Sequence, residues 1–227
     1  MKTNDEYRLR LWWLLLILLI TSTFGLVLAH YGPASFDGPL LLWFRVNGDT
    51  GLLAGPQWMA SFWSGLSGLG DKTPRIVISV LALFALLLLR RWHAALFIAG
   101  VLISGTLLTA ILKHGIARPR PQLVSHLDHI SSQSFPSGHT LTSTLFYLTL
   151  AWLLAPLLSR RISRLFLYTL AIILSLAIGV SRIALGVHWP SDVLASWVIA
   201  TTWLCLWVLL ANHFWPEALK DQTSDRL

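Results

Sequence analysis

Residues 165–211 read "LFLYTLAIILSLAIGVSRIALGVHWPSDVLASWVIATTWLCLWVLLA", two long apolar runs joined by a short polar passage. Each run has about the 20 residues that an α-helix needs to cross the apolar core of a bilayer. The join carries Arg182, His188 and Asp192. Charged side chains at the edge of a bilayer need a reason. The stretch therefore predicts two membrane helices with a functional site at the turn between them.

The composition of the whole chain supports a membrane environment. Of the 227 residues, 55% are hydrophobic and only 12% are charged. A soluble domain of this length could not bury so much apolar surface, which leaves the bilayer as the solvent. The formal charge is +7, but the basic residues are scattered singly between apolar runs, and this excludes a nucleic-acid-binding stripe. Cys205 is the single cysteine, so no disulfide can form within the chain.

The length of the apolar runs predicts an all-α polytopic membrane protein, a single integral-membrane domain over residues 1–227. We expect six transmembrane helices, at about 11–29, 74–89, 94–112, 140–158, 165–185 and 193–211. The first run is long and is followed by His30 rather than by a small-residue cleavage site, so we expect it to be retained. Glycine and proline interrupt the tryptophan-rich segment 37–70, which predicts an interfacial position for it.

Basic pairs in the short connections predict the orientation. Arg90–Arg91 and Arg160–Arg161 would both be cytoplasmic if the two termini are cytoplasmic, as the positive-inside rule favours. With six spans, the third and fifth then end on the outer face, where the fourth and sixth begin. The loop 113–139 and the passage 181–192 therefore meet at the outer membrane face, and we expect the active site there.

The residue types that meet at this face suit a phosphorylated ligand. Lys113, Arg120 and Arg182 provide three fixed positive charges for a phosphate or diphosphate group. Pro136 fits the first turn of the fourth helix, whose free N–H groups would bind an anion. Gly138 would let a phosphate approach the backbone closely.

Two histidines and an aspartate add acid–base chemistry. If Pro190 is the first helical residue, Asp192 is the third, from where its carboxylate could hold the ring N–H of His188. The other ring nitrogen of His188 would then be free and nucleophilic. His139 supplies a second imidazole that could protonate a leaving oxygen.

Each of these features has a simpler explanation when it is taken singly. Arginines at span ends commonly anchor a helix to lipid phosphates, a lone interfacial histidine is usually structural, and Pro-Ser-Gly is ordinary turn chemistry. Their joint occurrence at one face favours function. A metal centre is disfavoured because the acids predicted outside the membrane are too scattered to share a metal ion, and we expect no metal and no cofactor. These acids are Asp37, Asp49, Asp71, Asp128 and Asp192.

Three linked motifs resemble the signature of the type 2 phosphatidic acid phosphatase superfamily. They are "KHGIARPRP" (113–121), "PSGH" (136–139) and "SRIALGVHWPSD" (181–192). The first motif offers both Arg118 and Arg120, and only Arg120 has the family's spacing from Lys113.

The resemblance implies a metal-independent mechanism with a covalent intermediate. His188 would attack phosphorus and become a phosphohistidine, Asp192 would orient it, and His139 would protonate the departing oxygen. The residues implied to hold the phosphoryl oxygens are Lys113, Arg120, Ser137, Gly138 and Arg182.

The resemblance also implies a lipid phosphate substrate in a bacterial cytoplasmic (inner) membrane. The implied lipids are undecaprenyl diphosphate, phosphatidylglycerophosphate, phosphatidic acid and lipid A 1-phosphate, and the first is favoured because its recycling needs an outward-facing phosphatase. A lipid-to-lipid phosphotransferase and a non-enzymatic lipid transporter are the alternatives. We expect His126, Asp128 and His129, in the loop 122–134, to be plainly solvated. The sequence does not determine the oligomeric state.

Overall fold

The computed structural model of the chain describes residues 2–216. Its elements are α1 (Lys2–Tyr31), α2 (Asp37–Leu42), β1 (Arg45–Val46), β2 (Asp49–Leu53), α3 (Trp58–Gly68), α4 (Lys72–Leu88), α5 (Trp92–Ile116), α6 (Gly138–Leu154), the 3₁₀ turn η1 (Ala155–Leu157), α7 (Arg161–Ala184) and α8 (Pro190–Phe214). The two strands form one short antiparallel pair. The all-α prediction is confirmed, since this hairpin is the only sheet among the described residues.

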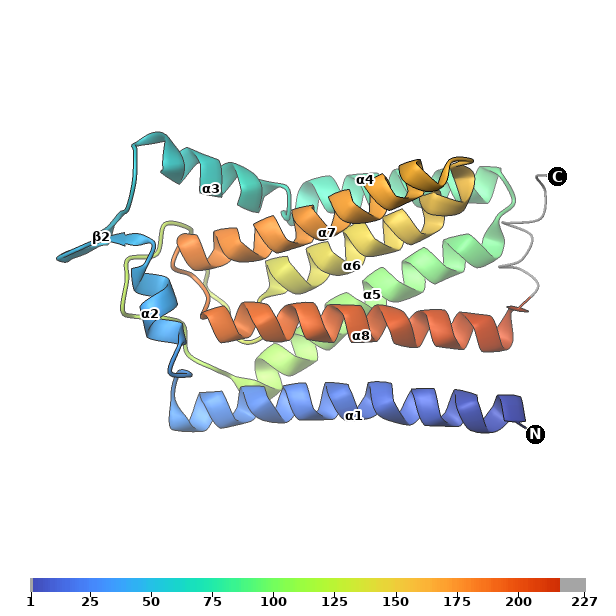
Figure 1. Ribbon diagram of the computed structural model, residues 1–227, viewed down its shortest axis with the longest axis horizontal. Helices are drawn as coiled ribbons and strands as arrows, with labels where there is room; N and C mark the ends of the chain where they lie inside the picture. The colour runs from blue at the N-terminus through green and yellow to red at the C-terminus, as the bar shows by residue number, and fades with distance from the viewer. Residues whose placement is uncertain (1, 217–227) are drawn as a thin grey trace.

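The long helices form an elongated bundle with two different ends (Figure 1). One end holds the start of α1 and the end of α8. The other, which we call the loop end, holds α2, the hairpin, and the α5–α6 and α7–α8 connections. Helix α6 packs against α5, α7 and α8, so it is the central element of the bundle.

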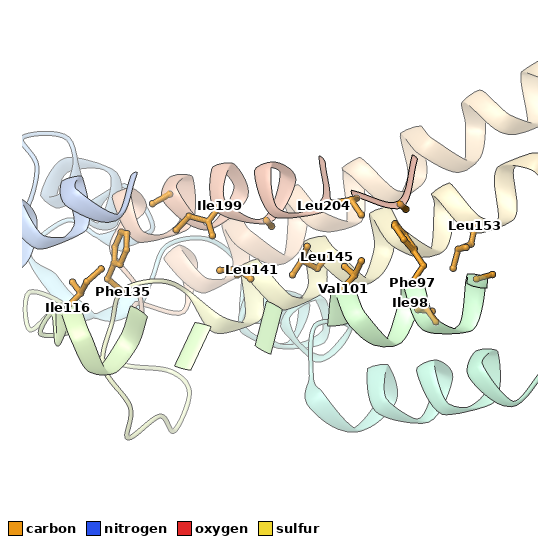
Figure 2. Packing of buried hydrophobic residues seen from close by; sticks show 14 residues of the cluster. Phe97, Ile98, Val101, Ile116, Phe135, Leu141, Leu145, Leu153, Ile199 and Leu204 are labelled. Carbon is orange, nitrogen blue, oxygen red and sulfur yellow. The ribbon is translucent and has the colours of Figure 1, made fainter. Parts of the chain in front are cut away.

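The core of the bundle is a layer of large apolar side chains between α5, α6 and α8 (Figure 2). Along the bundle, Leu141 of α6 lies near Ile199 of α8, Leu145 of α6 lies near Val101 of α5, and Phe97 of α5 lies further towards the opposite end. All five are at most 2% exposed. This packing holds the ends of the three helices in a fixed relation at the loop end.

The outer surface of the bundle is apolar, as expected for a protein dissolved in lipid. Helix α4 has no buried residue and exposes Ile76, Val80 and Phe84. In α1, only 11% of the most hydrophobic window is buried inside the protein. Since water would not tolerate such a surface, the molecule is a multi-pass membrane protein.

The predicted number of spans is wrong by one. Among the described residues, five helices are long and apolar enough to cross a membrane. These are Asn4–Tyr31, Trp92–Ile116, Gly138–Leu157, Arg161–Ala184 and Pro190–Phe214. The predicted second span, 74–89, forms α4, which has only 17 residues. At about 1.5 Å per residue such a helix is about 25 Å long, shorter than the roughly 30 Å apolar core of a bilayer.

The chain still returns to the loop end, so that the three motifs lie there together. Helices α3 and α4 together lead from the loop end to the opposite end, and α5 returns (Figure 1). The segment 37–70, predicted to be interfacial, forms α2, the hairpin and α3 at the loop end. Trp43 and Trp58 are exposed there, whereas Trp63 is partly buried. The interfacial depth of the segment 37–70 remains a prediction.

Candidate active site

The structure brings the predicted ionisable residues together at the loop end. Lys113 lies in the last turn of α5, and His139 lies in the first turn of α6. Arg182 lies in the last turn of α7, His188 in the α7–α8 connection, and Asp192 in the first turn of α8. Four helix ends thus contribute to one site, as the order of the motifs predicted.

His188 is buried, and its two ring nitrogens face different surroundings. Nδ1 lies 3.7 Å from Oδ2 of Asp192, and Nε2 lies 3.3 Å from Nη1 of Arg120. His188 is 1% exposed, and its Nδ1 has no hydrogen-bond partner among the described residues. The gap to Asp192 is wider than a hydrogen bond, which spans about 2.7–3.2 Å. The predicted pair is adjacent, and a small approach would close it.

Asp192 is fixed in place by donors on both carboxylate oxygens. Pro190 is the first residue of α8, as predicted, so Asp192 occupies the third position. Its Oδ2 accepts the backbone N–H of Trp189 at 3.1 Å and the hydroxyl of Ser134. Its Oδ1 accepts Nη1 of Arg118 at 2.5 Å.

Arg118 and Asp37 belong to the site and were missed in the sequence. Arg118 is 1% exposed and joins Asp192 to Asp37, whose Oδ2 lies 3.0 Å from Nη2. Within the segment "ARPRP", the spacing from Lys113 singled out Arg120 alone. No local signal set Arg118 apart, because side chains two residues apart on an extended segment ordinarily point to the same side. Asp37 carried no signal at all, since it lies 81 positions before Arg118.

Each of the three predicted cationic side chains contacts a polar group of the α5–α6 loop. Lys113 donates to the carbonyl of Gln133. Arg120 donates through Nε to the carbonyl of Ser132 at 2.6 Å. Nη1 of Arg182 forms an ion pair with Asp128 at 2.8 Å. The loop therefore covers the cationic groups.

Arg182 retains unused hydrogen-bonding capacity although it is fully buried. Nη1 also donates to the hydroxyl of Ser67. Nε and Nη2, which form one edge of the guanidinium, have no hydrogen-bond partner among the described residues. A buried guanidinium edge without a partner is costly unless a ligand satisfies it. This edge is suited to two oxygens of one phosphate.

The local electrostatics hold His188 in its neutral form. Burial, followed by the charges of Arg120 and Lys113, lowers the pKa of His188 well below its ordinary value. Burial and the nearby charge of Arg182 also lower the pKa of Arg120 to about 10, which leaves it charged at neutral pH. A neutral imidazole beside fixed cations is the form in which a histidine can act as a nucleophile.

His139 has a carboxylate partner that the sequence did not reveal. Its Nε2 lies 2.9 Å from Oδ1 of Asp71, which precedes α4. Asp71 is 68 positions away in the chain, so only the packing of the α3–α4 connection against α6 shows the pair. The Asp71 carboxylate thus fixes the orientation of the His139 ring.

The PSGH segment is arranged differently from the prediction. Helix α6 begins at Gly138 with Ser137 as its N-cap, a position that serine favours, so Pro136 precedes the helix instead of opening it. Ser137 is fully buried. Its N–H donates to Ser196 at 2.8 Å, and its hydroxyl accepts from Thr140 at 2.8 Å.

One cavity of about 860 Å³ joins this site to the apolar surface of the bundle. Its walls at the loop end include Lys113, Arg120, Gly138, His139 and His188. Towards the opposite end of the bundle, its walls are apolar side chains of α4 and α5: Ile76, Val80, Leu102, Ile103 and Leu107. The cavity thus combines a cationic head with an apolar channel.

Of the loop residues 126, 128 and 129, the two histidines are exposed, whereas Asp128 is not plainly solvated. His126 places Nε2 2.6 Å from the carbonyl of Pro121, Asp128 pairs with Arg182, and His129 lines the cavity. The solvation prediction is wrong for Asp128 because the α5–α6 loop folds back over the end of α7. Within residues 2–216, no three His, Cys, Asp or Glu side chains are grouped so as to hold a metal ion.

Bacterial phosphatases are similar in sequence to part of this chain. Phosphatidylglycerophosphatase B of Bacillus subtilis (strain 168) is 34% identical over 145 residues, which cover 60% of this chain and 68% of the relative. Lipid A 1-phosphatase of Rhizobium etli is 32% identical over 155 residues, 57% of this chain and 62% of that protein. Phosphatidylglycerophosphatase B of Escherichia coli (strain K12) is 40% identical, but over only 41% of this chain and 32% of its own length.

Two solved structures share the fold. The crystal structure of the first transmembrane PAP2 type phosphatidylglycerolphosphate phosphatase from Bacillus subtilis aligns with a TM-score of 0.75 at 24% identity, over 90% of this chain and 97% of that one. That of Aquifex aeolicus LpxE aligns with a TM-score of 0.57 at 20% identity, over 82% and 96%.

The family comparison covers every motif named above. The model of the PAP2 superfamily matches residues 94–216, more than half of the 227 residues. The site described above, apart from Asp37, Ser67 and Asp71, lies within the matched segment. By this match, and by the relatives that share it, the chain belongs to the PAP2 superfamily and is a membrane lipid phosphatase of that type.

Proposed function

We propose that the protein hydrolyses lipid phosphates without a metal ion, through a phosphohistidine on His188. One observation carries the proposal: neutral His188 lies with Nδ1 towards Asp192 and Nε2 towards Arg120, at the cationic head of a cavity with an apolar channel. The fixed cations replace the charge that a metal would supply to a phosphoryl group.

The first chemical step forms a bond between Nε2 of His188 and phosphorus. The bond from phosphorus to the leaving oxygen breaks, and His139 gives that oxygen its proton. Lys113, Arg120 and the unpaired edge of Arg182 bind the non-bridging oxygens, whose charge spreads as the transition state forms. Asp192 stabilises the positive charge that develops on the imidazole.

The second step releases inorganic phosphate. Water attacks phosphorus, the bond from phosphorus to Nε2 breaks, and His139, now neutral, accepts the proton of the water. Both steps use the same acid–base group in opposite directions. His188 then returns to its neutral form, which its surroundings favour.

The apolar channel accounts for a lipid substrate. Val80, Ile103 and Leu107 line it, on helices whose outer surfaces are apolar. A long hydrocarbon chain placed there would stay in an apolar environment while its phosphate reaches His188.

Two further cations support a diphosphate as the substrate. Lys72 and Arg75, in the first turn of α4, line the cavity directly after Asp71, the partner of His139. They lie on the side of the leaving oxygen, where a diphosphate carries its inner phosphoryl group. We therefore propose undecaprenyl diphosphate as the main substrate. Phosphatidylglycerophosphate and lipid A 1-phosphate, which the names of the relatives contain, are the next candidates, followed by phosphatidic acid.

The deciding experiment measures phosphate release by the purified protein in detergent, with and without EDTA. The panel contains the four lipids and a matched pair, farnesyl diphosphate and farnesyl monophosphate, which share one tail. We expect activity in EDTA and faster turnover of the diphosphate. If the protein released phosphate from none of the lipids, the proposed function would be overturned. If EDTA abolished activity and added divalent metal restored it, the metal-free mechanism would be overturned.

We also propose that the protein lies in a bacterial cytoplasmic membrane with both termini cytoplasmic and the loop end outside. The basic pairs Arg90–Arg91 and Arg160–Arg161, at the end opposite the site, support this orientation. After Cys205 is replaced by serine, a cysteine at exposed Gln122 should react with an impermeant thiol reagent on intact cells. A cysteine at exposed Ser159 should not, and the reverse pattern would place the site in the cytoplasm.

A further inference from the structure

We propose that Asp37 is a positioning residue for the reaction, acting on His188 through Arg118 and Asp192. The inference rests on the proposed role of His188 as the nucleophile. Asp37 opens α2 and lies outside the matched segment 94–216, so the family comparison assigns it nothing.

Asp37 is a fully buried acid whose carboxylate is held by several donors. It is 0% exposed, and it holds donors on both carboxylate oxygens. Oδ1 accepts the backbone N–H of Ser191 at 2.8 Å. Oδ2 accepts the hydroxyl of Ser191 at 2.7 Å and the N–H of Ala34 at 2.9 Å. These donors offset the cost of burying the carboxylate.

The contacts run in one direct line to the nucleophile. Arg118 contacts Asp37 through Nη2 at 3.0 Å and Asp192 through Nη1 at 2.5 Å. Asp192 then lies 3.7 Å from Nδ1 of His188. Ser191, which Asp37 holds, precedes Asp192 in the first turn of α8, so Asp37 fixes both the partner of Asp192 and its backbone.

Charge counting shows what Asp37 contributes. Asp192 and Arg118 alone would cancel, and the region behind His188 would be neutral. With Asp37 the buried group carries a net charge of −1. That charge matters because His188 becomes a phosphoimidazolium cation when Nε2 bonds to phosphorus. The other ionisable groups that act on His188 oppose this cation: Lys113, Arg120, Arg182 and His139.

The test replaces Asp37 by asparagine, which keeps the shape but removes the charge. Turnover of farnesyl diphosphate should fall about 10- to 100-fold, the usual effect of losing one charged hydrogen bond, with KM changed less than about threefold. Asp49→Asn is the matched control, because Asp49 is an exposed acid of the same loop end. Equal activity of the two variants would overturn the inference.

The pH profile distinguishes positioning from a merely structural role. Loss of the negative charge disfavours protonated His188, so the acidic limb of kcat/KM should move to lower pH in Asp37→Asn. An unmoved limb, with lower activity explained by a lower melting temperature, would overturn the inference.

A second variant keeps the test decisive if Asp37→Asn is unstable. Ser191→Ala removes the two hydrogen bonds of the Ser191 hydroxyl, one donated to Asp37 and one accepted from Arg118, but it leaves the charge of Asp37. It should lower turnover with no shift of the limb. In an Asp192→Asn background, Asp37→Asn should cost little more, because its route to His188 is already lost. Fully additive losses would overturn the inference, whereas inactivity of the unmodified protein would overturn the proposed function instead.

Discussion

The two sides of His188 are built on opposite principles. Behind it, Asp37, Arg118 and Asp192 are at most 1% exposed, and every charge there has a charged partner. In front of it, Lys113, Arg120 and Arg182 bring three positive charges, and the contacts described above give them one carboxylate, Asp128. The charges behind His188 are therefore paired within the folded protein, whereas those in front would be balanced by the phosphate of the proposed substrate.

This difference explains why two arginines of one short segment have different roles. Arg118 faces the buried acids, and Arg120 faces the cavity two residues later. A guanidinium between two buried carboxylates is needed for folding, since removal of one partner leaves uncompensated charge in the interior. A guanidinium at a cavity wall is free to exchange a carbonyl for a substrate oxygen.

The largest effect should come from the residue between the two sides. His188→Ala should lower phosphate release by about 10⁴-fold or more, because no other group is placed to accept the phosphoryl. Acid-labile phosphate trapped on the unmodified protein should be absent from the variant. His114→Ala, an exposed histidine of α5, is the control. Phosphoprotein in His188→Ala would mean that a different residue is the nucleophile.

The next effect tests the front and depends on the leaving group. His139→Ala should lose about 10²–10⁴-fold with farnesyl monophosphate, whose alkoxide needs a proton, and clearly less with farnesyl diphosphate. The inner phosphate of a diphosphate is a better leaving group, so the acid matters less. Side-by-side assays of both lipids measure the ratio. An equal loss for both would contradict a general-acid role.

A pair of substitutions tests the difference between the residues behind His188 and those in front of it. Arg118→Ala should destabilise the protein by about 3–5 kcal/mol, because Asp37 and Asp192 lose a shared partner in the interior. Arg120→Ala should unfold at nearly the unmodified temperature yet lose most turnover. Thermal unfolding in detergent and phosphate release separate the two. Similar melting temperatures would refute the division between a structural back and an exchangeable front.

The smallest effect concerns the loop that covers the front. Asp128→Asn removes the carboxylate that pairs with Arg182 at 2.8 Å, so a substrate phosphate no longer competes with it. The side chain of Asp128 is 37% exposed, which limits the gain to about 1 kcal/mol, or a several-fold lower KM. Inhibition by free phosphate should strengthen in parallel. A higher KM would show that Asp128 helps to bind the substrate.

The length of the second apolar run shows where sequence reasoning was weakest. The run 74–89 has the composition of a span, yet α4 has only 17 residues, and α3 connects its start to the loop end. Composition measures how apolar a segment is. It does not show whether the helix that forms is long enough to cross a bilayer.

The sequence by itself determined the membrane environment, the helical class and the meeting of three motifs, because these depend on apolar run length and order along the chain. It also placed Pro190 and Asp192 in the first turn of α8, a local matter of backbone geometry. Only the tertiary structure decided which acids serve the histidines. The pairs Asp37–Arg118 and Asp71–His139 join residues 81 and 68 positions apart. Such contacts depend on how α2 and the α3–α4 connection pack against the ends of α6 and α8, and no local pattern records that packing.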